Sequence, residues 1–566
     1  MELTGAEIVI QCMKDMGVEI VFGYPGGAIL FVYDEIYKHP EIRHILVRHE
    51  QGAVHMADGY ARVTGKPGVC IVTSGPGATN TVTGLATAYM DSIPLVLVTG
   101  QVPVSMIGND AFQEADVVGI TRSCTKHNYL VKNVNDLQRV MKEAFIVATT
   151  GRPGPVVVDV PKDVQQHKAP YLPMAEIPLR KSFSIPKADP AQVKKAFDLL
   201  LTAKQPLFYV GGGAVLSNAS REVAELAHLM GVPVAMTLMG LGAYPGTDDL
   251  SLGMLGMHGT YYANMAINNC DVLFAIGSRF DDRVTGKLSE FSVHSKKIHL
   301  DVDPSNISKN VFTDVAVVGD VKQVMNEMIL LAKNHKKLEG FKKQIQAWWE
   351  QIKQWKEKAP ITYQQSMEEQ IKPQYALDML YQLTKGEAIV TTDVGQHQMW
   401  AAQFFKFAKS HYWCTSGGLG TMGFGFPAAI GAQFAFPEAT VICVSGDGSI
   451  QMNIQELGTA VEHKLPVIVA IMNNNYLGMV RQWQELFYDN RLSQVTFGCM
   501  PDFVKLADSY GAQGFRVEKP KDVVPVIQQA LATRDRPTII DFVVALEENV
   551  YPMVPAGKGI SDIVLA

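Results

Sequence analysis

The sequence predicts an α/β protein with three doubly wound parallel-sheet domains. Short runs rich in Val, Ile and Leu, such as Val69–Thr73 and Leu95–Thr99, are typical of strands buried on both faces of a parallel sheet. The length of 566 residues is enough for three or four domains with large cores. A strand, a glycine turn, a helix and a second strand follow one another near both ends of the chain, so we expect the first and third domains to be similar.

Two glycine turns carry this repeat. Ser74-Gly75-Pro76-Gly77 follows one apolar strand, and Ser445-Gly446-Asp447-Gly448 follows another; each is followed by a helix, a proline and a new strand. Doubly wound folds in general share such turns, so coincidence is the alternative to a true repeat.

The expected domain limits come from composition. Five prolines between residues 165 and 190 indicate an extended linker, and the charged, Trp-containing segment 333–373 predicts one helix and a strap. We therefore expect an N-terminal domain over 1–165, a central Rossmann-like domain over 190–333, a C-terminal domain over 374–545 and a tail over 546–566.

Composition excludes several classes of protein. Hydrophobic residues make up 47% and charged residues 19%, which excludes wholesale disorder, and the net charge of −6 favours neither nucleic acid nor an anionic membrane as partner. The seven cysteines form no CxxC pair, so neither a zinc site nor a disulfide scaffold is expected. A cytoplasmic location is expected instead. No apolar run approaches the ~20 residues of a membrane span, and Met1–Met13 lacks the basic start of a secretory signal.

Gly446-Asp447-Gly448 and Asn474 stand at the ends of two predicted strands, where open α/β sheets bind ligands. A carboxylate and an amide carbonyl are hard oxygen ligands that suit Mg²⁺, together with phosphates and water. The helix that starts after Gly448 offers free N–H groups to the same phosphates. The alternative is an ordinary turn aspartate that caps a helix.

The segment from Gly446 to Asn474 resembles the thiamine diphosphate motif, which identifies only a cofactor superfamily. Further segments, spread over nearly the whole chain, resemble the FAD-containing biosynthetic type of the acetolactate synthase (acetohydroxyacid synthase) catalytic large subunit. The segments are Gly23–Ala28, Arg48–Ala53, Asp110–Glu114, Pro161–Val164, Gly256–Gly259, Arg279–Gly286 and Gly478–Trp483. The last two narrow the resemblance to this family.

The resemblance implies thiamine diphosphate, Mg²⁺ and a structural FAD as cofactors, with a set of residues for each role. The implied catalytic residues are Glu50, Gln113 and Lys162. The implied cofactor-binding residues are Tyr24, Gly26, Glu50, Pro76, Asn80, Arg152, Val394, Gly395, Gln396, His397, Gly420, Met422, Gly446, Asp447, Gly448, Ser449, Asn474, Tyr476, Gly478 and Met479, of which Asp447, Asn474 and Tyr476 would hold the metal. The implied substrate residues are Phe112, Met257, Arg283, Val480 and Trp483.

Single residues also have simpler interpretations. Glu50 follows the predicted strand Ile45–Arg48 and could be a surface helix cap, whereas the family uses this carboxyl on the cofactor's pyrimidine ring. Met422 could be a core residue, whereas similar enzymes use a bulky apolar residue there to bend the cofactor. Arg283 could form two hydrogen bonds to a substrate carboxylate, and the Trp483 indole could contact the side chain of the second keto acid and select it by size. The glycines at 211–213 lack the last Gly of GxGxxG and are a weak dinucleotide signal.

The implied reaction decarboxylates pyruvate and joins the two-carbon unit to a second pyruvate or 2-ketobutyrate. The products are 2-acetolactate or 2-aceto-2-hydroxybutyrate, precursors of valine, leucine and isoleucine. The family places its site between two chains, which implies a homodimer or higher oligomer and a small regulatory subunit. The rivals are a pyruvate oxidase-like redox flavoenzyme, another thiamine diphosphate carboligase such as glyoxylate carboligase, whose family lacks the Glu50 carboxylate, and a non-catalytic cofactor-binding protein.

Overall fold

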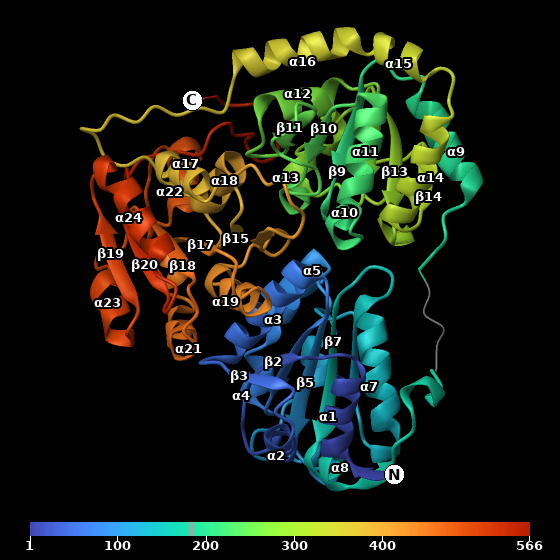
Figure 1. Ribbon diagram of the computed structural model, residues 1–566, viewed down its shortest axis with the longest axis vertical. Coiled ribbons are helices and arrows are strands. Elements are labelled where there is room, and N and C mark those ends of the chain that lie inside the picture. The colour runs from blue at the N-terminus through green and yellow to red at the C-terminus, as the bar shows by residue number, and fades with distance from the viewer. Residues whose placement is uncertain (180–184, 566) are drawn as a thin grey trace.

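The computed structural model describes residues 1–179 and 185–565 and contains three six-stranded sheets whose strands are all parallel, which confirms the predicted fold class (Figure 1). We call each sheet with its helices a unit. The N-terminal unit lies at the bottom of the view, the middle unit at the upper right and the C-terminal unit at the left. The domain limits given above stay a prediction.

The N-terminal sheet has the strand order β3-β2-β4-β5-β7-β6. Its strands are β2 (Ile20–Tyr24), β3 (Arg43–Leu46), β4 (Gly68–Val72), β5 (Leu95–Gln101), β6 (His127–Leu130) and β7 (Pro155–Pro161). Its helices are α1 (Gly5–Asp15), α2 (Leu30–Lys38), α3 (Glu50–Thr64), α4 (Pro76–Thr79), α5 (Val82–Asp91), α6 (Val117–Thr121), α7 (Val134–Thr149) and α8 (Lys162–Gln166). The central strands are buried throughout because helices cover both faces. A separate antiparallel pair joins β1 (Glu2–Thr4) to β8 (Lys168–Pro170).

The C-terminal sheet has the order β16-β15-β17-β18-β20-β19. Its strands are β15 (Ile389–Thr392), β16 (Trp413–Thr415), β17 (Val441–Gly446), β18 (Ile468–Asn473), β19 (Gln513–Val517) and β20 (Thr538–Val543). Its helices are α17 (Pro373–Leu383), α18 (Gln396–Phe404), α19 (Gly425–Ala435), α20 (Asp447–Ile450), α21 (Leu457–Glu462), α22 (Gly478–Phe487), α23 (Phe503–Tyr510) and α24 (Pro520–Ala532), with the short 3₁₀ helix η6 (Ile454–Glu456). Numbered within each unit, both terminal sheets have the order 2-1-3-4-6-5. The predicted similarity of the first and third domains is therefore confirmed.

The middle sheet has the order β11-β10-β9-β12-β13-β14, which is 3-2-1-4-5-6 within the unit and is the dinucleotide-binding order. Its strands are β9 (Pro206–Val210), β10 (Val234–Met236), β11 (Ser251–Met254), β12 (Val272–Ile276), β13 (Lys296–Asp301) and β14 (Val315–Val318). Its helices are α9 (Pro190–Leu200), α10 (Gly212–Leu216), α11 (Ser220–Met230), α12 (Tyr261–Asn269), α13 (Asp282–Thr285) and α14 (Val321–Lys333). The order changes direction between β9 and β12, so a ligand crevice is expected at their carboxyl ends.

Two local predictions need correction. The segment after the middle unit forms two helices, α15 (Leu338–Gln344) and α16 (Gln346–Lys358), where one was expected; Trp348 is buried there. The strand predicted over Ile45–Arg48 is β3, and it ends at Leu46. The N–H of Val47 still bonds to Gly23 of β2, but those of Arg48 and His49 turn away from the sheet toward Glu456 of the C-terminal unit. The predicted linker 165–190 includes residues 180–184, which lie outside the described residues.

The terminal units pack through α3 and α19, which lie side by side in Figure 1. A Cβ on Gly59 of α3 would lie 2.2 Å from the backbone oxygen of Ala428, and one on Gly431 of α19 would lie 1.9 Å from that of Met56. Only glycine permits this approach of two backbones. An apolar cluster that includes Phe22 of the N-terminal unit and residues of α19 continues across the junction, so the two units share part of one core.

The predicted tail, 546–566, is not a loose end over its described residues. Val550, Met553 and Ile560 are buried. The N–H of Val550 donates to the side chain of Gln482 in α22 at 2.9 Å, and residue 554 bonds to the backbone of Met257 in the middle unit. The segment therefore ties the middle unit to the C-terminal unit beside residues that the sequence assigns to the substrate pocket.

Candidate active site

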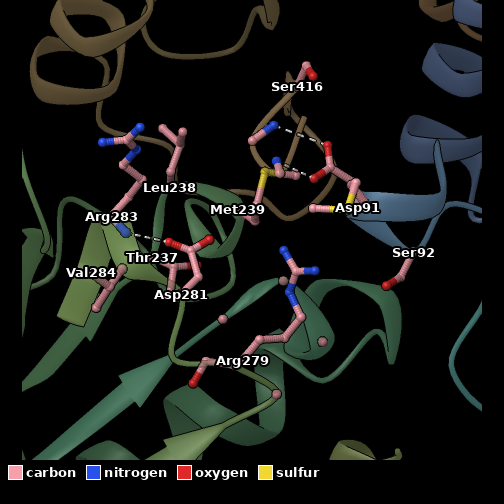
Figure 2. Close-up of a pocket in the computed structure, with 18 of the residues that line it drawn as sticks. Asp91, Ser92, Thr237, Leu238, Met239, Arg279, Asp281, Arg283, Val284 and Ser416 are labelled. Atoms are coloured by element: carbon pink, nitrogen blue, oxygen red, sulfur yellow. Dashed lines mark hydrogen bonds between the residues drawn. The ribbon is translucent and has the colours of Figure 1, made fainter. Parts of the chain in front are cut away.

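A cavity of about 720 Å³ lies where the three units meet. It is lined mainly by the segments that follow parallel strands at their carboxyl ends, which is where α/β sheets bind ligands. The lining segments include Gly211–Gly213 and Gly277–Arg283 of the middle unit, Ser416–Gly420 and Met479–Trp483 of the C-terminal unit, and Met90–Ser92 of the N-terminal unit. Figure 2 shows side chains from all three units around this space.

Asp447 begins α20 directly after β17, and its carboxylate is buried. It accepts hydrogen bonds from the backbone N–H of Asn475 at 2.6 Å and of Gly448 at 2.8 Å. Among the described residues, no basic side chain forms an ion pair with it. Burial raises the pKa of Asp447 to about 7. A buried carboxylate without a compensating cation suits a metal ligand, because the metal would supply the missing charge.

Asn474 follows β18, the strand next to β17, so the structure brings the two strand ends together. Its side-chain oxygen accepts from the N–H of Tyr476 at 3.1 Å, and the loop folds back against Asp447. In the described part of the chain, no group of three or more His, Cys, Asp or Glu side chains could hold a metal. A site with one carboxylate, one amide and one backbone oxygen therefore needs phosphate and water as further ligands, which suits Mg²⁺.

His397 lies over the glycine turn that precedes Asp447. A Cβ on Gly446 would lie 3.0 Å from the His397 ring, so the ring and the turn are in close contact. The Nε2 atom of His397 is buried and has no hydrogen-bond partner among the described residues. Burial lowers the pKa of this imidazole to about 3, so the ring is neutral at pH 7. The tautomer with the proton on Nε2 would let this nitrogen donate to a phosphate beside the start of α20.

The loop that carries Gly420 and Met422 is held from the N-terminal unit. Asp91, at the end of α5, accepts hydrogen bonds from the backbone N–H of Gly417 at 3.1 Å and of Gly418 at 2.7 Å (Figure 2). Gly420 has φ of 72°, a left-handed conformation that favours glycine. Val394, Gly395, Gly420, Met422 and Met479 line the cavity together. The loop is thus fixed at the cavity wall.

Four of the five predicted substrate residues line the cavity: Met257, Arg283, Val480 and Trp483. The Arg283 guanidinium lies over the Trp483 indole, with 5.8 Å between the guanidinium carbon and the ring centroid. The N–H of Met257 donates to the backbone oxygen of Arg283 at 2.7 Å. A cation stacked on a flat apolar ring can bind a carboxylate beside a small apolar group. The fifth residue, Phe112, is 88% exposed and does not line the cavity.

Glu50 starts α3 in the N-terminal unit, away from the cavity lining. Its Oε2 accepts from the side-chain amide of Asn80 at 3.0 Å. A Cβ on Gly77 would lie 3.5 Å from the other carboxylate oxygen, and Gly75 touches the backbone of Gln113, whose φ is 58°. Glu50, Pro76, Asn80 and Gln113 therefore surround one glycine turn.

The remaining N-terminal residues lie near this turn or apart from it. Gly26 packs on Thr73, because a Cβ there would lie 2.5 Å from the Thr73 side chain, and Thr73 also touches Gly77. Tyr24, at the end of β2, is 40% exposed. Lys162 begins α8, and its ammonium lies 5.9 Å from the Phe31 ring. Among the described residues, no hydrogen bond or ion pair joins Lys162 to Glu50.

The middle unit forms a glycine-lined crevice at the carboxyl ends of β9 and β12. A Cβ on Gly211 would lie 2.4 Å from the backbone oxygen of Gly277, so the turns after β9 and β12 approach each other closely. Arg152 reaches the same cavity from the N-terminal unit, where its Nε donates to Ser92 at 2.8 Å and its guanidinium lies 3.7 Å from Asp303. The glycine cradle and the arginine fit a ligand with a pyrophosphate.

Comparison with known proteins agrees with this geometry. The chain matches the thiamine pyrophosphate enzyme N-terminal TPP binding domain over residues 3–120, the central domain over 193–328 and the C-terminal TPP binding domain over 393–542. It is 49% identical to the acetolactate synthase isozyme 3 large subunit of Escherichia coli, over 100% of this chain and 99% of that protein. It is 49% identical to the acetolactate synthase large subunit of Haemophilus influenzae, over 100% and 98% of the two chains. The chain belongs to the acetolactate synthase large-subunit family. A similar relationship holds with the acetolactate synthase of Mycobacterium bovis, at 48% identity over 99% and 91% of the two chains.

In this member of the acetolactate synthase family, most of the predicted site residues form two groups, and Lys162 lies outside both. One group lines the cavity or the turns after β17 and β18; the other surrounds the turn after β4 in the N-terminal unit. None of the described helices is long and apolar enough to cross a lipid bilayer.

Two buried acids of this acetolactate synthase family member were not among the predicted site residues. Asp91 holds the Gly417–Gly418 backbone from the N-terminal unit, and Glu456 of the C-terminal unit holds the turn before Glu50. In sequence, both look like ordinary helix acids. The backbone groups that they hold lie 326 or more residues away, so no local signal marks this role.

Proposed function

We propose that the chain forms 2-acetolactate from two pyruvates, or 2-aceto-2-hydroxybutyrate from pyruvate and 2-ketobutyrate, in branched-chain amino acid biosynthesis. Full-length identity to named acetolactate synthases supports this function. The structural observation that carries it is the hydrogen bond from Asn475 to Asp447, which joins the two halves of the thiamine diphosphate motif at neighbouring strand ends.

Thiamine diphosphate supplies a nucleophilic carbon and an electron sink for decarboxylation when it is bound. The chain's own residues hold it in our proposal. Asp447, the Asn474 side chain and the Tyr476 backbone would bind Mg²⁺, and the start of α20 with His397 would bind the phosphates. The buried carboxylate and the unpartnered imidazole nitrogen support these roles.

Glu50 would bind the pyrimidine ring and hold a proton at the ring nitrogen. The amide of Asn80, 3.0 Å from Oε2, fixes the direction of this carboxylate. Gln113 would line the same half-site. Because the Glu50 group lies outside the cavity of its own chain, we infer a homodimer in which two half-sites from different chains meet. The exposed Phe112 and Tyr24 are then covered by the second chain.

Arg283 would bind the carboxylate of the acceptor keto acid, and Trp483 would contact its methyl or ethyl group. FAD would occupy the cavity arm formed by Gly211–Gly213 and Arg152. The reaction transfers no net electrons, so we infer a structural role for the flavin. The relatives are named as large subunits, and we therefore propose a small-subunit partner as well. A cytoplasmic location stays a prediction that the free cysteines fit.

The test is product analysis with pyruvate, thiamine diphosphate, Mg²⁺ and FAD. We expect acetolactate, with the flavin band of the purified protein unchanged through turnover. Acetate formation with stoichiometric bleaching of the flavin would instead assign the chain to the redox flavoenzyme class. Absence of any product from the fully loaded protein would support the non-catalytic alternative.

A further inference from the structure

Glu456 lies in η6 of the C-terminal unit and is completely buried. Its two carboxylate oxygens accept from the backbone N–H of Arg48 at 3.0 and 3.1 Å, and one of them also accepts from the N–H of His49 at 3.0 Å. A fourth bond comes from the hydroxyl of Thr459 at 2.7 Å. The side chain is thus satisfied almost entirely by backbone of another unit.

Arg48 and His49 are the two residues before Glu50, and His49 is the N-cap of α3. The N–H groups that Glu456 binds therefore belong to the turn that carries the proposed catalytic carboxylate. The Arg48 side chain points elsewhere: its guanidinium donates to the backbone of Leu46 and to the exposed Glu462. Glu456 fixes the backbone of this turn, while Asn80 fixes the Glu50 side chain.

The fit is tight on the opposite side as well. A Cβ on Gly52 would lie 2.5 Å from a carboxylate oxygen of Glu456. Gly52 is in the first turn of α3, so the helix start and the acid have room for each other only because this residue is glycine. Burial raises the pKa of Glu456 to about 7, which shows how far the site is removed from water.

We propose that Glu456 is a positioning residue that sets the place of Glu50 from the C-terminal unit of the same chain. It touches no substrate or cofactor and acts through the backbone of residues 48 and 49. This inference rests on the proposed function, because it takes Glu50 as the catalytic carboxylate. An error of about 1 Å at a reacting group can cost roughly 100-fold in rate, so such a clamp matters for turnover.

The test compares Glu456→Gln with Glu462→Gln in the cofactor-loaded protein. The amide keeps the shape but replaces one acceptor oxygen by a donor, which faces an N–H group. For Glu456→Gln we expect kcat to fall roughly 10- to 100-fold, with the KM for pyruvate and the Kd for thiamine diphosphate nearly unchanged. Glu462→Gln, which alters only the exposed partner of Arg48, should keep the wild-type kcat.

Hydrogen exchange gives a readout without turnover. In Glu456→Gln, the backbone amides of Arg48 and His49 should exchange about 2- to 12-fold faster, the range expected for one lost hydrogen bond. Amides of α7, on the other side of the N-terminal sheet, should be unchanged. Unchanged exchange at residues 48 and 49 would overturn the proposal.

A double-mutant cycle separates positioning from general stability. If Glu456 acts through Glu50, Glu456→Gln should lower kcat less than about twofold in a Glu50→Gln background. A full, multiplicative loss there would mean a merely structural role and would overturn the inference. Near-normal turnover of Glu50→Gln alone would overturn both this inference and the role of Glu50. No acetolactate from the wild type would refute the proposed function, whereas the exchange result would still test the clamp.

A second perturbation covers the case in which Glu456→Gln does not fold. Gly52→Ala keeps the Glu456 side chain, but the added methyl group displaces its carboxylate from the side of α3. Alanine favours helix over glycine by about 1 kcal/mol, which offsets part of the steric cost of the added methyl group. We expect the same pattern, a lower kcat and an unchanged KM, and wild-type kinetics in a folded Gly52→Ala protein would contradict the proposal.

Discussion

The N-terminal and C-terminal units share one strand order, 2-1-3-4-6-5, yet the corresponding turns carry different chemistry. After the third strand, the C-terminal unit has Gly446-Asp447-Gly448 and the N-terminal unit has Gly75-Pro76-Gly77. The aspartate adds a buried carboxylate beside Asn474, whereas the proline has neither a charge nor an N–H group. In our proposal, the same scaffold therefore binds a metal in its C-terminal copy.

At the turns after the second strand, the N-terminal unit carries the carboxylate and the C-terminal unit does not. In the N-terminal unit this turn leads to Glu50, a carboxylate held by Asn80. In the C-terminal unit it is the apolar, glycine-rich loop with Gly420 and Met422. Each unit thus contributes one carboxylate, at a different turn. The two copies complement each other, which is what a site assembled from two half-sites requires.

Removal of the N-terminal carboxylate should have the largest effect. Glu50→Gln keeps the shape and the Asn80 contact but cannot stay charged beside a protonated ring. We expect kcat for acetolactate to fall roughly 10²–10⁴-fold, the usual value of general acid–base assistance. Flavin content and the unfolding temperature should not change, which would show that the fold is intact. Near-normal turnover would remove Glu50 from the catalytic role.

Removal of the C-terminal carboxylate should act on binding. Asp447→Ala takes away the charged metal ligand, so we expect the Kd for Mg²⁺ to rise at least about 100-fold. The Kd for thiamine diphosphate should rise with it, because the metal joins protein and phosphates. Titration against intrinsic fluorescence measures both constants. Unchanged affinities in the folded variant would contradict the metal assignment.

A double variant tests whether the turn alone makes the difference between the two units. In an Asp447→Ala protein, Pro76→Asp places a carboxylate at the equivalent N-terminal turn. We expect no recovery of Mg²⁺ binding, because the end of β5 continues as Val102-Pro103 and offers no counterpart of Asn474. Recovery would mean that the turn alone makes the metal site.

Much of this site could be predicted because the motif residues follow strand ends. The sequence predicts the strand Val69–Thr73 and the turn Gly446–Ser449 because in both places a buried apolar run leads into a glycine turn. The fold brings these strand ends to one edge of each sheet. The strand β6 was not among the predicted strands, because His127–Leu130 is polar and only partly buried at a sheet edge. Asp91 and Glu456 could not be found for another reason: their role depends on backbone far away in sequence, which appears only after the units have packed.

A moderate effect is expected at Trp483, on the helix α22 that follows the fourth strand of the C-terminal unit. Trp483→Leu removes the flat ring under Arg283, and we expect the preference for 2-ketobutyrate over pyruvate to fall about tenfold, within the range of one methylene against an apolar wall. Competition between the two keto acids gives the product ratio. Leu486→Ala, on the same helix but outside the cavity lining, is the matched control. An unchanged ratio with collapsed turnover would make Trp483 a packing residue.

The smallest effect concerns two aspartates, one on the sixth strand of each terminal unit. Asp159 of β7 is buried and accepts from Thr99 at 2.7 Å and from Gln101 at 3.0 Å, both of them neutral. Asp541 of β20 accepts from Asn473 at 2.8 Å and from the Arg516 guanidinium at 3.0 Å. Among the described residues, only the C-terminal aspartate has a charged hydrogen-bond partner. Replacement of each aspartate by asparagine should therefore give different results.

Burial raises the pKa of Asp159 to about 7, above its ordinary value. A carboxyl whose pKa is raised by folding stabilises the fold in its protonated form, so its contribution is lost as pH rises from about 4 toward 7. Asp159→Asn cannot titrate and can still bond to Thr99 and Gln101. Between pH 5.5 and pH 8, the wild type should therefore lose about 2 kcal/mol of unfolding free energy relative to this variant. Thermal unfolding at the two pH values measures the difference. Asp541→Asn should instead destabilise at both pH values, because Arg516 loses its buried partner and keeps only the more exposed Asp502. Equal pH profiles for the wild type and Asp159→Asn would show that Asp159 stays ionised in the fold.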